Sequence, residues 1–179
     1  MDALEQRKTE RAKVLWNLCW HPTYASECVR WIEQEDIDLN YSAESGEPII
    51  YIVVRNRNLI LLHKLIEYGV DVNKSNTEGY TALHQACYIG SIEMATLLLN
   101  NNANVNAQTK LGETPLHAAI YAGNVDMIYL LIKYNVDISI TTKYGNNPIF
   151  LLSQNSHDNY SDLVLFFLRL LWNIPEKKE

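Results

Sequence analysis

The sequence repeats itself every 33 residues, and this period restricts the chain to folds built from stacked, similar units. The marking glycines are Gly46, Gly79, Gly112 and Gly145. A second series stands six residues earlier in each unit, at Asn40, Asn73, Asn106 and Ser139. Such a period is typical of solenoids, in which one unit cannot bury its apolar side alone and therefore packs on its neighbours.

Each of the best-preserved units carries the start and stop signals of two short helices. Thr81 and Thr114 are suited to cap a first helix, because a threonine hydroxyl can accept a hydrogen bond from a free helical amide. Pro115 suits the first helical position, where its missing N–H costs nothing. Residues that tolerate a left-handed backbone then end the first and second helices. They are Gly90 and Gly123, and Gly69, Asn102 and Asn135.

Residues 81–86 (Thr-Ala-Leu-His-Gln-Ala) and 114–119 (Thr-Pro-Leu-His-Ala-Ala) resemble the centre of an ankyrin repeat. The resemblance covers about residues 23–172. It implies an all-α solenoid of helix–turn–helix repeats with projecting β-hairpin loops. It also implies protein binding on the concave face, which hairpin tips and first helices form together. The family has no shared catalytic residues to carry over.

The register predicts a single ankyrin-repeat domain over residues 1–179, with about five repeats. They are a degenerate cap at 1–42, repeats at 43–75, 76–108 and 109–141, and a C-terminal cap at 142–174, followed by a tail at 175–179. The last repeat slips by three residues, because residues 161–168 match residues 125–132 at a step of 36. We place the insertion in the polar stretch 154–160, where a surface loop tolerates it.

Two stretches of the chain depart from the regular repeat pattern. The β-branched stretch 49–54 would favour a strand by propensity, but the period predicts the first helix of the second repeat. In the degenerate first repeat we expect helices over 2–20 and 26–34. We expect Leu4, Leu15 and Cys19 on one stripe of the first helix, and Ser26 as the N-cap of the second.

Composition narrows the function classes. Hydrophobic residues make up 47% of the chain and the net charge is −6, which disfavours nucleic acid as a partner. The three cysteines form no C-x-x-C pair, and this favours a reducing, cytoplasmic setting. The most apolar run, 163–172, is about half a membrane span and contains Arg169, so we expect no membrane insertion.

Three groupings of reactive or aromatic residues have simpler structural interpretations. His84 and Cys87 lie one helical turn apart, but the repeat itself dictates their positions, and we expect His84 and His117 to bond to neighbouring hairpins. Cys19, His21 and Cys28 lack a zinc spacing and a fourth ligand. We therefore predict no catalytic residue, metal or cofactor. The tryptophans at 16, 20, 31 and 172 either cover the ends of the stack or, for the N-terminal three, mediate self-association of an otherwise monomeric protein.

The positions that the repeat leaves free carry the candidate binding site. Tyrosines lie at several of them, on the hairpins and at the ends of the first helices, where the fold does not require an aromatic residue. Tyrosine is also enriched at interaction hot spots. We expect Tyr88 and Tyr121 as central anchors. The full predicted protein-binding set is Tyr80, Tyr88, Ile89, Lys110, Leu111, Glu113, Tyr121, Tyr144, Glu78 and Arg55.

These features predict a non-catalytic protein–protein interaction module. One alternative is a small regulatory inhibitor or adaptor. A related alternative is a host-directed effector in the host cytosol that sequesters a signalling protein, since the abundance of Asn, Ile, Lys and Tyr suggests an AT-rich genome. A further alternative is a structural protein that self-assembles through its tryptophan-rich end.

Overall fold

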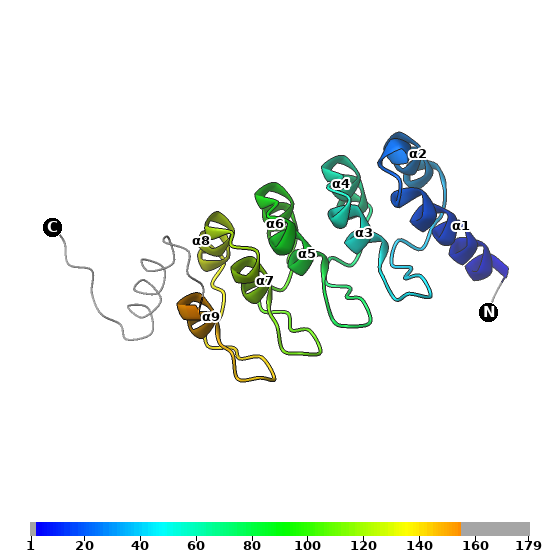
Figure 1. The fold of residues 1–179 in the computed structure, drawn as a ribbon. Coiled ribbons are helices and arrows are strands. Elements are labelled where there is room, and N and C mark those ends of the chain that lie inside the picture. The colour runs from blue at the N-terminus through cyan, green and yellow to red at the C-terminus, as the bar shows by residue number, and fades with distance from the viewer. Residues whose placement is uncertain (1–2, 155–179) are drawn as a thin grey trace.

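A computed structural model of the protein describes residues 3–154 as a curved row of helix pairs with loops projecting to one side (Figure 1). Within that range there are nine α-helices, one 3-10 turn (Pro22–Tyr24) and no extended strand. The helices are α1 (Ala3–Cys19), α2 (Ala25–Gln34), α3 (Ile49–Arg55), α4 (Leu59–Glu67), α5 (Ala82–Ile89), α6 (Ile92–Asn100), α7 (Pro115–Tyr121), α8 (Val125–Lys133) and α9 (Pro148–Gln154). The predicted all-α repeat solenoid is confirmed.

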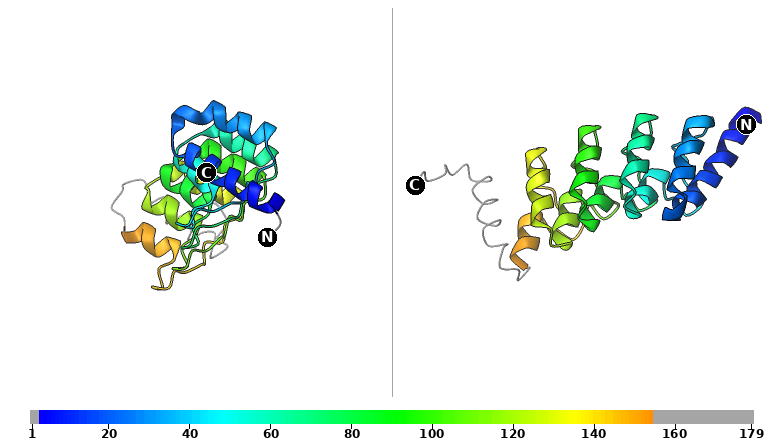
Figure 2. Two further views of the ribbon diagram at one scale, coloured as in Figure 1. Left: turned by 90° about the vertical axis from the view of Figure 1, so that its right-hand side faces the viewer. Right: turned by 90° about the horizontal axis from the view of Figure 1, so that it is seen from above.

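The helices form two rows (Figure 2). The first helices of the repeats, α3, α5, α7 and α9, pack on one another in sequence order, and α2, α4, α6 and α8 do the same in the second row. Helix α3 covers the β-branched stretch 49–54, so the period predicted this helix correctly against local propensity. The predicted insertion at 154–160 and the final helix lie outside the described residues, apart from Gln154 at the end of α9.

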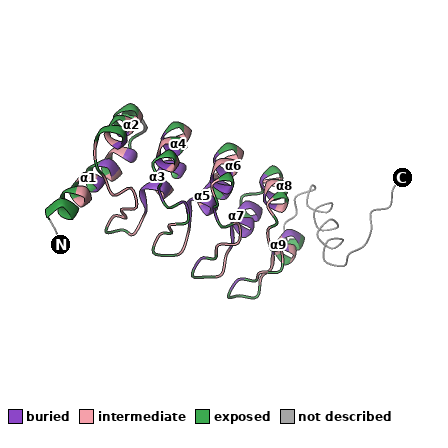
Figure 3. Cartoon of the chain, turned by 180° about the vertical axis from the view of Figure 1, so that it is seen from behind, coloured by how far each residue is buried: buried purple, intermediate pink, exposed green. Residues whose placement is uncertain are grey.

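The core repeats with the sequence period. Many buried positions recur at a step of 33 residues. Two such series, all buried, are Ile32, Leu65, Leu98 and Leu131 in the second row, and Ile50, Leu83 and Leu116 in the first. Figure 3 shows the first-row helices α5 and α7 largely buried, whereas the second-row helices keep exposed outward surfaces. Each repeat therefore buries its apolar side only against its neighbours.

Asparagine side chains join consecutive repeats along the loops after the second helices. The Oδ1 atoms of Asn40, Asn73 and Asn106 each accept a hydrogen bond from the backbone N–H 31 residues later, at 2.7, 2.7 and 2.8 Å. This explains the asparagine period in the sequence, since each side chain satisfies an amide of the next repeat.

The hairpins are joined by backbone bonds. The N–H of Lys110 donates to the carbonyl of Glu78, and the N–H of Lys143 donates to that of Leu111, both at 2.8 Å. The hairpins approach so closely that a Cβ on Gly79 would lie 2.8 Å from the Cα of Thr109. Glycine is therefore required at residue 79 both for its φ of +89° and for space.

Histidine side chains form a third type of hydrogen bond between consecutive repeats. The N–H of Thr81 donates to Nδ1 of the buried His84 at 3.1 Å, which places the ring proton on Nε2. Nε2 then donates to the carbonyl of Glu113 at 3.1 Å, on the next hairpin. His117 repeats the arrangement with Thr114 and with the carbonyl of Asn146. The prediction that these histidines bond to neighbouring hairpins is correct.

The first repeat differs from two expectations. Helix α2 begins at Ala25 after the 3-10 turn, so Tyr24 holds the N-cap position without a side-chain bond, and Ser26 lies inside the first helical turn. The prediction of Ser26 as the cap was wrong, because the 3-10 turn leads directly into the helix and places the N-cap two residues earlier, at Tyr24. In α1, Leu15 and Cys19 are buried as expected, but Leu4 is exposed, since the helix extends beyond its neighbours there.

Two hairpin glycines that share one backbone conformation allow a direct test of hairpin stacking. Gly79 and Gly145 both have a positive φ, but a Cβ on Gly145 would meet no described atom within 4 Å. We expect Gly145→Ala to lower the free energy of unfolding by about 1 kcal/mol from backbone strain alone. Gly79→Ala should cost about 1–3 kcal/mol more, because the hairpins must also move apart. Urea denaturation followed by circular dichroism measures both, and equal losses would contradict the close-approach argument.

Candidate functional site

A pocket of about 260 Å³ opens between the hairpins and the first-row helices. Helix α3 contributes Tyr51, α5 contributes three residues, α7 contributes two, and the hairpins contribute Tyr80 and Glu113. The complete lining is Tyr51, Tyr80, His84, Gln85, Tyr88, Glu113, Ala118 and Tyr121. The wall is largely apolar and spans three consecutive repeats, so it exists only because the repeats are stacked.

Tyr80 and Glu113 form one side of the pocket. The Tyr80 hydroxyl donates to Oε2 of Glu113 at 2.6 Å, and this bond raises the pKa of Tyr80 to about 12. The Tyr80 ring also packs edge-on against the His84 ring, with centroids 5.6 Å apart. Both contacts hold the tyrosine ring in place before any ligand arrives.

Tyr51 and Gln85 form another side, which the sequence analysis did not assign to the site. The Tyr51 hydroxyl donates to Oε1 of Gln85 at 2.9 Å, and burial raises the pKa of Tyr51. Tyr51 stands 33 residues before His84, in the slot that holds histidine in the next two repeats. This departure from histidine was the sequence feature that could have indicated a role for Tyr51 in the site.

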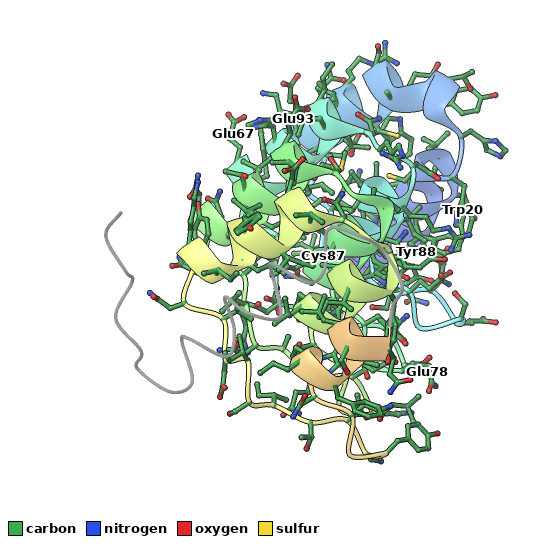
Figure 4. All side chains as sticks on the ribbon, turned by 60° about the vertical axis from the view of Figure 1, so that its left-hand side comes forward. Trp20, Glu67, Glu78, Cys87, Tyr88 and Glu93 are labelled. Carbon is green, nitrogen blue, oxygen red and sulfur yellow. The ribbon has the colours of Figure 1, made fainter. Side chains whose placement is uncertain are left out.

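Tyr88 and Tyr121 are the exposed rings of the pocket. Their exposed fractions are 64% and 49%, at the C-terminal parts of α5 and α7. In Figure 4, Tyr88, Trp20 and Glu78 lie on one side of the stack, while Glu67 and Glu93 lie on the other. Four of the predicted site residues, Tyr80, Tyr88, Glu113 and Tyr121, are thus brought together.

The other predicted residues lie outside the lining of this pocket. Ile89 is half-buried against the core, and its carbonyl accepts a hydrogen bond from Arg57 at 2.7 Å. At the hairpins, Lys110 and Glu78 form an exposed ion pair with an N–O distance of 3.6 Å. Leu111 and Tyr144 are exposed. They extend the predicted surface along the tips rather than into the pocket.

Arg55 is engaged by neighbours within the chain. Its guanidinium lies 4.3 Å from the Trp20 ring centroid, and it donates to Glu47 at 2.9 Å. Trp20 packs in turn edge-on against Trp16, and the Trp16 indole donates to the carbonyl of Glu47 at 2.9 Å. Arg55 therefore ties the first repeat to the second on the side of the stack that carries Tyr88.

The groups with reactive side chains are buried in the repeat framework. Burial raises the pKa of the Cys87 thiol and lowers the pKa of His84 to about 4. Cys19 and Cys28 face each other with sulfurs 4.0 Å apart. Among residues 3–154, no three His, Cys, Asp or Glu side chains are grouped to hold a metal ion. Over the same residues, no helix has both the length and the hydropathy to cross a membrane.

Comparison with protein families matches residues 16–109 to ankyrin repeats (3 copies) and residues 98–151 to ankyrin repeats (many copies). The chain belongs to the ankyrin-repeat family. Members of this family are generally protein–protein interaction modules and typically non-catalytic.

Curated relatives share only part of this chain. Potassium channel AKT1 of Oryza sativa subsp. indica is 44% identical over 57 residues, 31% of this chain and 6% of the channel. BTB/POZ domain-containing protein 1 of Schizosaccharomyces pombe is 37% identical over 68 residues, 37% of this chain and 5% of that protein. Protein phosphatase 1 regulatory subunit 27 of Mus musculus is 30% identical over 71 residues, 40% of this chain and 46% of the subunit. The chain therefore spans less than half the length of each of these relatives.

The buried His84 predicts a pH dependence of stability. Its pKa is about 4 in the fold against an ordinary 6.5, so between these values the unfolded chain binds the extra proton. The free energy of unfolding therefore falls as the pH falls through this window, by up to about 1.4 kcal/mol per pH unit. We expect the stability advantage of the native protein over His84→Gln to shrink between pH 7 and pH 5 in urea denaturation. His63→Gln, at an exposed position of α4, controls for the loss of an imidazole. An advantage that stays constant would contradict the buried neutral ring.

Proposed function

We propose that this protein binds a partner protein, without catalysis, through the concave face centred on Tyr88 and Tyr121. The observation that carries the proposal is the tyrosine-lined pocket between three repeats. Its two most exposed rings occupy positions that the repeat does not require to be aromatic. Tyrosine offers a large contact area with few rotatable bonds, so it loses little entropy on binding.

The rigidity of the face supports the same function. Tyr80 and Tyr51 are held by hydrogen bonds to Glu113 and Gln85, and the hairpins are held by backbone bonds between repeats. A surface ordered in advance loses less conformational freedom when a partner docks. The exposed Leu111 and Tyr144 at the hairpin tips extend the contact beyond the pocket.

A regulatory role is the second proposal, because the mouse relative is named as a regulatory subunit of a phosphatase. A small solenoid that covers part of a signalling protein can inhibit it or recruit it without any chemistry of its own. We also propose a reducing, cytoplasmic setting, since all three cysteines of the chain are free thiols buried in the packing.

Affinity capture tests the concave face. We expect Tyr88→Ala combined with Tyr121→Ala to weaken partner capture by about a thousandfold, because each ring is placed as a hot spot worth about 2 kcal/mol. The matched control is Tyr68→Ala combined with Tyr129→Ala, which removes two exposed tyrosines from the second-row side and should leave capture intact.

Circular dichroism must show native helicity for both double variants. A folded Tyr88/Tyr121 variant that still captures the same protein would falsify the concave-face proposal. Mass spectrometry of the captured proteins separates the two roles. One dominant target indicates an inhibitor or adaptor, and several unrelated targets indicate a scaffold.

We propose that the protein is a monomer. The three tryptophans of the first repeat are half-buried and packed against the core, and Trp16 is hydrogen-bonded, which favours their role as a cover for the end of the stack. Light scattering should give a mass near 20.6 kDa at every concentration. A mass that rises with concentration and returns to the monomer value in Trp31→Ala would instead support self-association.

A further inference from the structure

The concave pocket combines aromatic rings with one carboxylate. Of its eight lining residues, four are tyrosines, and Glu113 carries the only formal charge at neutral pH. His84 adds no positive charge there, because burial keeps its ring neutral and both ring nitrogens are bonded to Thr81 and Glu113 backbone atoms. The cavity thus presents electron-rich rings and negative charge, with no cation among the lining residues that the structure describes.

Only one oxygen of the Glu113 carboxylate is hydrogen-bonded to the described part of the chain. Oε2 of Glu113 accepts from Tyr80, while Oε1 has no hydrogen bond from any residue between 3 and 154. An apolar side chain in the pocket would remove water from this oxygen without replacing its hydrogen bond, at a cost in affinity. A cationic donor would replace the water and gain a charge-assisted bond.

One cation on this side of the stack is already engaged within the chain. Arg55 lies on the same side of the stack, but it is stacked on Trp20 and paired with Glu47. That arrangement shows, within the same fold, how a guanidinium can lie over an aromatic face while a glutamate accepts a hydrogen bond from one of its nitrogens. The pocket offers the same two elements, tyrosine rings and a carboxylate, without an internal guanidinium.

We propose that this pocket binds an arginine side chain of the partner protein, with its guanidinium stacked on the tyrosine rings and paired to Glu113. Arginine fits better than lysine, because a planar guanidinium stacks on aromatic faces and donates in several directions at once. Glu113 and Gln85 both line the pocket and carry acceptor oxygens for those donors, although Gln85 Oε1 also accepts from Tyr51. This inference rests on the proposed function and names the chemistry of the segment that enters the face.

The test is a titration of the full chain with short capped peptides, followed by amide shifts in 1H–15N NMR spectra. The probe is acetyl-Gly-Gly-Arg-Gly-Gly-amide, and the matched probes carry citrulline, norleucine or lysine in place of arginine. We expect the arginine peptide to shift the amides of Gln85, Tyr88 and Tyr121 with a Kd on the order of 1 mM. Citrulline has nearly the same shape without the charge, so its peptide should bind at least about tenfold more weakly.

Two variants locate the charge. Glu113→Gln keeps an acceptor for Tyr80 but removes the carboxylate, and should weaken the arginine peptide about tenfold. Glu93→Gln removes the same charge from the opposite side of the stack, as Figure 4 shows, and should leave binding unchanged. Equal losses in both variants would show only a general charge effect and would overturn the proposal.

The remaining outcomes are also decisive. Norleucine or lysine peptides that bind as tightly as the arginine peptide would overturn the assignment of a guanidinium, and so would the absence of pocket shifts with any peptide. None of these peptide results changes the interpretation of the affinity-capture experiment. A partner that is lost in the Tyr88/Tyr121 variant but kept in Glu113→Gln would leave the concave-face function standing and this inference rejected.

Discussion

Side-chain and backbone hydrogen bonds between repeats are the constraint on which this structure depends. A helix pair of this size has no core of its own, so its apolar side is buried only while its neighbours stay in register. Three hydrogen-bonding groups each bond to an adjacent repeat, in three different parts of the repeat. They are Asn73 after a second helix, His84 on a first helix and the N–H of Lys110 on a hairpin. Because the joints recur at a 33-residue step, helices, hairpins and pocket walls are all positioned by the same geometry.

This constraint explains why the sequence predicted so much of the fold. A hydrogen bond that recurs between each pair of neighbouring repeats requires the same residue type every 33 residues. The period in the sequence therefore reflects the contacts between repeats in the structure. The residues that cap and end the helices follow the same logic, and Asn102 and Asn135 do adopt the left-handed backbone expected of them. Tyr88 and Tyr121 could be proposed as exposed anchors because the register places them on the first-row helices without a structural reason to be aromatic.

What the register could not predict depends on contacts between particular side chains. Nothing in the period indicates that Tyr51 turns toward Gln85, or that Arg55 is held by Trp20 and Glu47. Arg57 is a further case, since it stands at the step of Gly90 and Gly123 yet takes a φ of +57° while donating to the carbonyl of Ile89. Each of these arrangements occurs between one pair of repeats only. The sequence therefore contains no repeated pattern from which they could be predicted.

Glu113 takes part both in the contact between two repeats and in the pocket. Its backbone carbonyl accepts a hydrogen bond from Nε2 of His84 and so helps close the junction between two repeats, while its side chain lines the pocket. A partner bound in this pocket, as proposed above, would contact both sides of that junction. Its binding would therefore favour the closed junction, and neighbouring repeats would unfold together rather than one at a time.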